Sequence, residues 1–80
     1  MREISNMTWN YRVVHRVANG EDQYAIHETY YEDDKPISIT EQAVNPEGET
    51  LNELKDDFAY YLSALEQPVL EFSDFDTSKA

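Results

Sequence analysis

The stretch EGETLNELKDDFAYYLSALEQPVL, residues 47–70, contains the local signals of one complete α-helix. Thr50 and Glu53 form a capping box, in which each side chain can accept a hydrogen bond from the backbone N–H of the other residue. Pro68 ends the helix, because proline lacks the N–H that a further turn would need. Apolar side chains recur between these signals at the 3.6-residue period of one helix face. They are Leu51, Leu54, Phe58, Tyr61, Leu62 and Leu65.

Upstream of this helix, apolar and polar side chains alternate with the period of a half-buried β-strand. Strands are predicted over residues 8–17 and 23–31, and the Asn19-Gly20 pair between them favours a tight hairpin turn. A short turn places odd positions of the first strand and even positions of the second on one face. That face is the predicted core, with Trp9, Tyr11, Val13, Val17, Tyr24, Ile26 and Tyr30.

A third strand is predicted at ISITEQAV (37–44), after the polar turn EDDKP (32–36), with Ile37 and Ile39 facing inward. A three-stranded antiparallel sheet with one apolar face needs a cover, and the amphipathic helix supplies one. The segment PVLEF (68–72) is a candidate for a short fourth strand.

The predicted fold is therefore α+β, with elements in the order β-β-β-α-β. One domain is expected over residues 8–72, because a chain of 80 residues builds a single small core. A flexible leader (1–7) and a flexible acidic tail (73–80) are expected on either side, because neither segment shows apolar periodicity.

Composition narrows the class of protein. Hydrophobic residues make up 40% of the chain and aromatic residues 12%, which is too much apolar material for an acidic disordered chain. The absence of cysteine excludes disulfides, thiolate metal sites and a cysteine nucleophile. The apolar runs are far shorter than the roughly 20 residues of a membrane span, and no secretory signal is visible. A soluble, cytoplasmic protein without membrane contact is expected.

The charge is strongly negative, with 17 Asp and Glu against 6 Lys and Arg and a net charge of −11. Direct nucleic-acid binding is disfavoured, because it depends on Lys and Arg that displace counterions from phosphates. The electrostatic field of a negatively charged protein favours encounter with a basic protein, for example one that itself binds or processes nucleic acid. The alternative is that the acidic surface serves solubility alone.

No residue pattern indicates an enzyme, a cofactor or a metal site. His15 and His27 lie on opposite faces of the predicted hairpin and would not converge on one ion. Two glycines are too few for a phosphate-binding loop, and the acidic turn lacks the ligand spacing of a calcium loop. Glu28 is the one acid on the predicted core face, and it is expected at the sheet margin or paired with Arg12 or Arg16.

Two surfaces are predicted to bind a partner. The first is the polar face of the hairpin, whose cationic and aromatic side chains are of the types that anchor interfaces. Its candidate residues are Arg12, Arg16, His27 and Tyr31. The second is the acidic side of the helix, with Glu53, Asp56 and Asp57. The alternative for both surfaces is an ordinary solvated face.

The helix segment, preceded by a hairpin and a third strand, resembles the core of HicB-type antitoxins over residues 9–72. The family's Gly-x-Thr-Leu-x-Glu turn is matched by Gly48, Thr50, Leu51 and Glu53, and its helix face by Leu54, Phe58, Leu62 and Leu65. The Pro-Asp-Leu-Pro-Gly-Cys-like stretch of that family is replaced here by HETYYEDDKPISI (27–39). MTWNYRVV (7–14), YAIHETYY (24–31) and VNPEGETL (44–51) also resemble a group of small, uncharacterised bacterial and phage-borne proteins.

The functional hypothesis is a small acidic, non-enzymatic regulator or inhibitor, antitoxin-like or anti-defence-like, that binds a basic partner protein through its surface. The alternative is a homodimerisation module, in which strand edges or the tyrosine-rich face of two copies meet.

Overall fold

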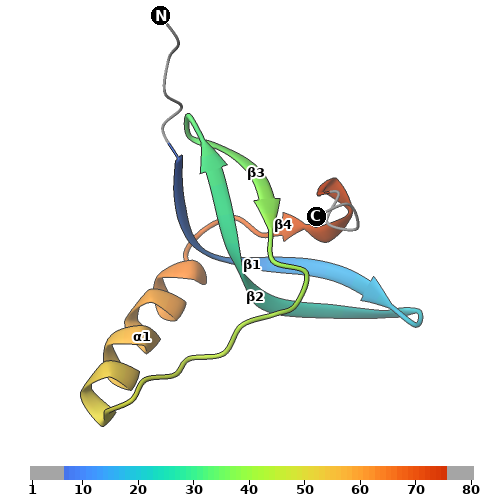
Figure 1. The fold of residues 1–80 in the computed structure, drawn as a ribbon. Coiled ribbons are helices and arrows are strands. Elements are labelled where there is room, and N and C mark those ends of the chain that lie inside the picture. The colour runs from blue at the N-terminus through green and yellow to red at the C-terminus, as the bar shows by residue number, and fades with distance from the viewer. Residues whose placement is uncertain (1–6, 76–80) are drawn as a thin grey trace, which may run out of the picture.

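In a computed structural model, which describes residues 7–75, the chain forms one four-stranded sheet and one α-helix (Figure 1). The strands follow the order β3-β2-β1-β4, and β4 runs parallel to β1 while the other neighbours are antiparallel. The elements are β1 (Met7–Ala18), β2 (Glu21–Glu32), β3 (Lys35–Ile39), α1 (Leu51–Ala64), β4 (Leu70–Glu71) and η1 (Phe72–Asp74), a single turn of 3₁₀-helix. The predicted α+β class, with three antiparallel strands, one helix and a short fourth strand, is confirmed.

The hairpin of β1 and β2 has the predicted turn and the predicted pairing of faces. Asn19 and Gly20 both take positive φ angles, 54° and 78°, as a two-residue hairpin turn requires. Val13 lies opposite Ile26 in the register, so odd positions of β1 and even positions of β2 share a face. Both strands are longer than predicted, because pairing continues to the residues that flank the turn.

The third strand is shorter than predicted. β3 ends at Ile39, although backbone hydrogen bonds from Thr40 N to Glu28 O (3.0 Å) and from Val44 N to Ile26 O (2.8 Å) keep the following segment beside β2. The prediction of a strand to residue 44 is wrong, because the Thr40 hydroxyl bonds locally to the Gln42 carbonyl (2.8 Å). Such a local hydrogen bond bends the backbone away from a regular ladder.

The start of α1 is built as a variant of the predicted capping box. The Thr50 hydroxyl accepts a hydrogen bond from Glu53 N (3.1 Å), as predicted. The Glu53 carboxylate accepts from Glu49 N (2.9 Å) rather than from the N–H of Thr50. Gly48 packs against this first turn so closely that an added Cβ would lie 2.6 Å from Leu54 N. The segment before the helix is therefore fixed by both hydrogen bonds and close packing.

The core does not lie only on the predicted face of the sheet. The most buried side chains are Arg12, Val13, Val14, His27, Thr29, Ile39, Tyr61 and Ala64, and several of them belong to the face predicted to be polar. That face is covered by the segment after α1, where Phe72 packs 6.0 Å from the His27 ring. By contrast, Trp9, Val17 and Tyr24 on the predicted core face are more than half exposed. The prediction of a core on one face of the sheet is wrong, because buried side chains lie on both faces and part of the predicted core face is exposed.

The helix contacts the sheet through one edge of the predicted face, where Tyr61 lies, and not through the centre of that face. α1 packs on β1 through Tyr61 and Ala64, and Figure 1 shows its first turn standing away from the strands. Most of the predicted helix face is exposed to solvent. Leu51, Phe58, Leu62 and Leu65, called the apolar stripe below, are 65%, 49%, 61% and 63% exposed.

The ends of the predicted domain shift slightly. Met7, assigned to a leader, is the first residue of β1, and residues 73–74, assigned to a tail, belong to η1. Phe75, also assigned to the tail, caps η1, and residues 1–6 of the expected leader and 76–80 of the expected tail lie outside the described residues.

Candidate functional site

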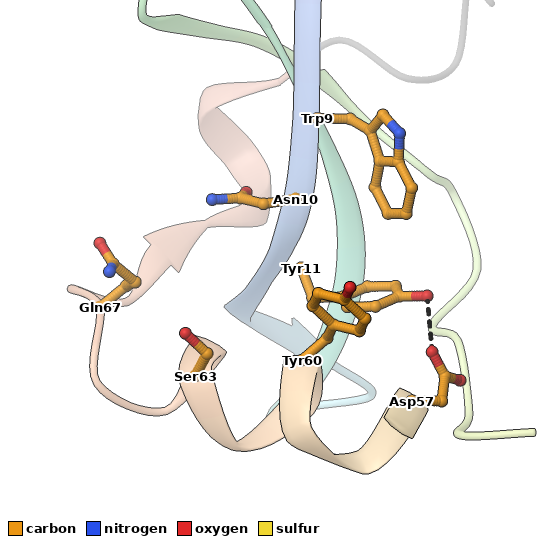
Figure 2. Close-up of a pocket in the computed structure, with 7 residues that line it drawn as sticks. All are labelled: Trp9, Asn10, Tyr11, Asp57, Tyr60, Ser63 and Gln67. Carbon is orange, nitrogen blue, oxygen red and sulfur yellow. Dashed lines mark hydrogen bonds between the residues drawn. The ribbon is translucent and has the colours of Figure 1, made fainter. Parts of the chain in front are cut away.

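A pocket of about 460 Å³ opens between β1 and α1 (Figure 2). Its walls combine aromatic rings, one carboxylate and several neutral polar groups. The lining residues are Trp9, Asn10, Tyr11, Asp57, Tyr60, Ser63 and Gln67.

The periodicities of the two elements explain why these residues meet. Trp9 and Tyr11 are two positions apart in β1, and side chains at that spacing share one face of a strand. Asp57, Tyr60 and Ser63 recur every three residues in α1 and therefore line one side of the helix. The contact between β1 and α1 brings the two rows together.

Aromatic rings form a continuous wall. Trp9 meets Tyr11 edge to face, with ring centroids 5.3 Å apart, and Tyr11 lies 6.5 Å from Tyr60 and 4.4 Å from Tyr61. The separations of Tyr11 from Trp9 and Tyr60 fall in the favourable range for aromatic pairs, and that from Tyr61 lies at its lower limit. Trp9 and Tyr60 are 54% and 65% exposed, so much of this wall is open to a ligand.

Asp57 supplies the negative charge of the pocket and also ties three segments together. Its carboxylate accepts hydrogen bonds from the Tyr11 hydroxyl (3.3 Å), marked in Figure 2, and from the backbone N–H of Glu47 (3.0 Å). These bonds join α1 to β1 and to the loop that precedes the helix. Removal of this side chain would therefore affect the shape of the pocket as well as its charge.

The tyrosines beside Asp57 remain neutral. Burial and then the charge of Asp57 raise the pKa of Tyr11 above its usual value. Burial raises the pKa of Tyr61 further, with contributions from Tyr11 and Asp57. Both phenols are thus protonated at neutral pH, and Asp57 has the one carboxyl group among the lining residues.

This combination suits a cation that also has apolar surface. Aromatic faces attract guanidinium and ammonium groups within about 6 Å of the ring, and tryptophan does so most strongly. A carboxylate at the edge of such a wall adds charge and a hydrogen-bond acceptor. An arginine or lysine side chain of another protein has both features.

Two of the residues predicted to form a partner-binding sheet face are buried. Arg12 is 8% exposed, and its guanidinium donates to the Tyr31 hydroxyl and to the Pro68 carbonyl, both at 2.7 Å. His27 is 2% exposed and forms a 2.8 Å hydrogen bond with the Thr40 carbonyl through Nδ1. The expectation that these two side chains lie on an open surface is wrong, because the segment after α1 covers this part of the sheet.

The other two residues of that predicted face also make internal contacts. The Arg16 guanidinium carbon lies 4.0 Å from the centre of the Phe72 ring, and Tyr31 is held by Arg12. Glu28, expected beside Arg12 or Arg16, instead accepts a hydrogen bond from the Tyr30 hydroxyl, so that pairing is wrong. The strand register explains this, because Glu28 shares a face with Tyr30 and Tyr11, not with the arginines.

The structure separates the three acids predicted on α1. Glu53 is used to cap the helix, Asp57 lines the pocket, and Asp56 is exposed. The pocket thus contains one predicted partner-binding residue, Asp57, beside the aromatic residues Trp9 and Tyr60 that sequence reasoning did not assign to a site. The neighbouring aromatics Tyr60 and Tyr61 were a usable signal, since only one of two adjacent helix positions can face the sheet.

Within residues 7–75, no three His, Asp or Glu side chains gather as a metal site would require, and no helix is long and apolar enough to cross a membrane. Comparisons with protein-family models, with curated proteins and with solved structures found no match to the chain.

Proposed function

We propose that this protein is a small acidic regulator or inhibitor that binds a basic partner protein, with the pocket between β1 and α1 as the point of recognition. The observation that carries the proposal is the meeting of exposed Trp9 and Tyr60 with the carboxylate of Asp57. An arginine or lysine of the partner would stack on the rings and pair with Asp57.

The charge of the chain supports the same kind of partner. A net charge of −11 would speed encounter with a basic protein and oppose encounter with DNA or RNA. A nucleic-acid-handling protein in the cytoplasm would fit both requirements. The resemblance to HicB-type antitoxins is the basis for assigning an antitoxin-like or anti-defence-like role.

The test uses the single tryptophan of the chain, which lies in the pocket and reports on it by fluorescence. We expect a tri-arginine peptide to change the emission of Trp9 in a saturable manner. Added NaCl should weaken this binding, because a large part of the attraction is electrostatic. A tri-glutamate peptide should leave the emission unchanged.

Two adjacent acids provide a matched pair of variants. Asp57→Asn removes the charge inside the pocket, whereas Asp56→Asn removes the same charge from an exposed position outside it. We expect Asp57→Asn to lower the affinity for the tri-arginine peptide by about fivefold or more. Asp56→Asn should lower this affinity by about twofold at most. Equal effects of the two variants would show that only the overall charge matters, and would contradict the assignment of the pocket.

A further inference from the structure

The solvent exposure of the apolar stripe of α1 is not explained by the pocket, because none of its residues lines the pocket. Its four side chains lie on one side of the helix and are each about half or more exposed. Contiguous apolar patches of several hundred Å² are uncommon on monomers and mark interaction sites. Tyr61 and Ala64 hold the neighbouring side of the helix against β1, so the stripe remains directed away from the sheet of its own chain.

We propose that the apolar stripe binds the apolar stripe of a second copy of this chain, with the two helices antiparallel. The spacing of the residues argues for this occupant. Leu51, Phe58 and Leu65 are each seven positions apart, so these three residues of the stripe are symmetric about Phe58. A two-fold interface requires a self-complementary patch of this kind. Antiparallel pairing places Phe58 on the partner's Phe58 and Leu51 on the partner's Leu65.

The charges beside the stripe favour the antiparallel direction. Lys55 follows Leu51 by four positions within α1, and Glu66, in the turn directly after α1, follows Leu62 by four, so both charged residues border the stripe on the same side. Antiparallel pairing brings Lys55 toward the end of the partner helix that carries Glu66. The offset along the axis is about 7.5 Å when the two Phe58 side chains face each other, which two long side chains can span. Parallel pairing would place Lys55 of one copy and Glu66 of the other on opposite flanks of the interface, so that this pair of opposite charges could not form.

The size of the stripe sets the expected strength of the dimer. Stable complexes bury about 800 Å² on each partner, and one stripe of a 14-residue helix offers less than this. We therefore expect a dissociation constant in the micromolar range. Because each copy has a net charge of −11, the copies repel each other, and added salt should strengthen the dimer. Binding of a basic peptide in the pocket should respond to salt in the opposite direction.

The experiment measures the mass of the full chain by sedimentation velocity from low micromolar to submillimolar concentration. Phe58→Asp places a charge at the centre of the stripe, and Ala59→Asp places the same charge on the adjacent exposed residue outside it. We expect Phe58→Asp to raise the dissociation constant by at least about tenfold and Ala59→Asp by about twofold at most. Circular dichroism checks that both variants fold.

A charge exchange tests the orientation. We expect Lys55→Glu to weaken the dimer, and the double variant Lys55→Glu, Glu66→Lys to restore it. A monomer at all concentrations would overturn the proposal and would leave the stripe to a different protein. A dimer that is insensitive to Phe58→Asp would also overturn it, and would point to the strand edges instead.

The proposed dimer does not depend on the proposed binding of a basic partner. The stripe and the pocket share no residue, so Phe58→Asp should change the affinity of Trp9 for the peptide by about twofold at most, as expected for a charge outside the pocket. Trp9→Ala, which removes one aromatic wall of the pocket from β1, should in turn leave the mass distribution unchanged. The peptide titration and the sedimentation experiment therefore test the two proposals separately, and one proposal can fail while the other holds.

Discussion

Arg12 shows how a single side chain can join distant parts of the chain. Its buried guanidinium donates to Tyr31 across the hairpin and to the carbonyl of Pro68, 56 positions away. Its rigid fork of donors can reach two acceptors at once, which a flexible ammonium does poorly. The alternation of the strand predicts which face Arg12 occupies, but it gives no sign of the carbonyl that arrives from the C-terminal side.

We expect Arg12→Lys to lower the free energy of unfolding by about 2 kcal/mol, because a lysine cannot satisfy both acceptors and leaves one of them buried without a donor. Urea denaturation followed by circular dichroism measures this loss. Tyr31→Phe removes one of the two hydrogen bonds of Arg12 and should lower the free energy of unfolding by less than Arg12→Lys does. Unchanged stability of Arg12→Lys would contradict a structural role for the guanidinium.

Thr29 is the most completely buried polar residue of the sheet. Its side chain is fully inaccessible, and its hydroxyl has no hydrogen-bond partner within the described part of the chain. We expect Thr29→Val, which keeps the shape and removes the hydroxyl, to raise the free energy of unfolding by about 1 kcal/mol. Thr29→Ala, which leaves a cavity, should lower it in the same urea assay. A loss of stability in Thr29→Val would indicate a partner for the hydroxyl.

At the scale of elements, short sequence motifs predict the features that neighbouring residues determine, such as turns and helix ends. The hairpin turn follows from the conformational freedom of Asn19 and Gly20, and the helix start follows from the Thr50 cap. The side of each element that becomes buried depends on long-range packing. The segment containing Phe72 covers the even-numbered face of β1, and no periodicity within β1 could reveal this cover.

The start of α1 gives a test of close packing. In Gly48→Ala the new methyl group would meet backbone and side-chain atoms of Glu53 and Leu54 at 2.6–2.8 Å. We expect a loss of about 2 kcal/mol in the free energy of unfolding, because backbone atoms must move to relieve the contact. Glu49→Ala, an exposed neighbour, should change stability by less than about 0.5 kcal/mol in the same thermal or urea assay. Similar losses in both would contradict the packing argument.

His15 connects three strands. Its two ring nitrogens lie 2.7 Å from the Asp22 carboxylate in β2 and 2.8 Å from the Glu71 carboxylate in β4, and its ring packs 4.8 Å from Tyr24. Both nitrogens can donate at the same time only in the protonated imidazolium. These hydrogen bonds, first to Asp22 and then to Glu71, raise the pKa of His15 above its usual value.

The direction of this shift predicts how stability depends on pH. The contribution of His15 is complete below the unfolded-state pKa of about 6.5 and is lost as the pH rises through the higher folded-state pKa. We expect the melting temperature to fall from about pH 6 to pH 9, and the fall to be smaller in His15→Gln. NMR titration of the His15 ring protons measures the same pKa directly. Identical pH profiles for the two proteins would contradict the proposed clamp.

At the scale of the whole molecule, the location of the candidate site could not be predicted from the sequence. Asp57 was identified by its charge, but the pocket exists only because α1 rests on β1 through Tyr61 and Ala64. The amphipathic pattern of α1 predicts that the apolar stripe faces the sheet. The structure instead turns it outward, because Tyr11 and Asp57 fix the rotation of the helix.

The net charge of −11 should also affect the stability of the folded chain. Because like charges repel within the compact state, we expect the melting temperature to rise as NaCl screens them. The measurement is made on Phe58→Asp at fixed protein concentration, so that salt-promoted association cannot add to the effect. A fall in melting temperature would show that attractive pairs, such as those of His15, outweigh the repulsion.

The position of the segment that covers the even-numbered face of the sheet has a consequence for synthesis on the ribosome. The hairpin, residues 7–32, is made early, whereas Pro68 and Phe72, which contact Arg12 and Arg16 on it, are made much later. Translation proceeds at only about 5–20 residues per second, so the nascent hairpin waits for several seconds with this face open. Completion of the sheet must therefore follow the emergence of residue 72 from the exit tunnel, and a chaperone that binds the waiting hairpin would act within this interval.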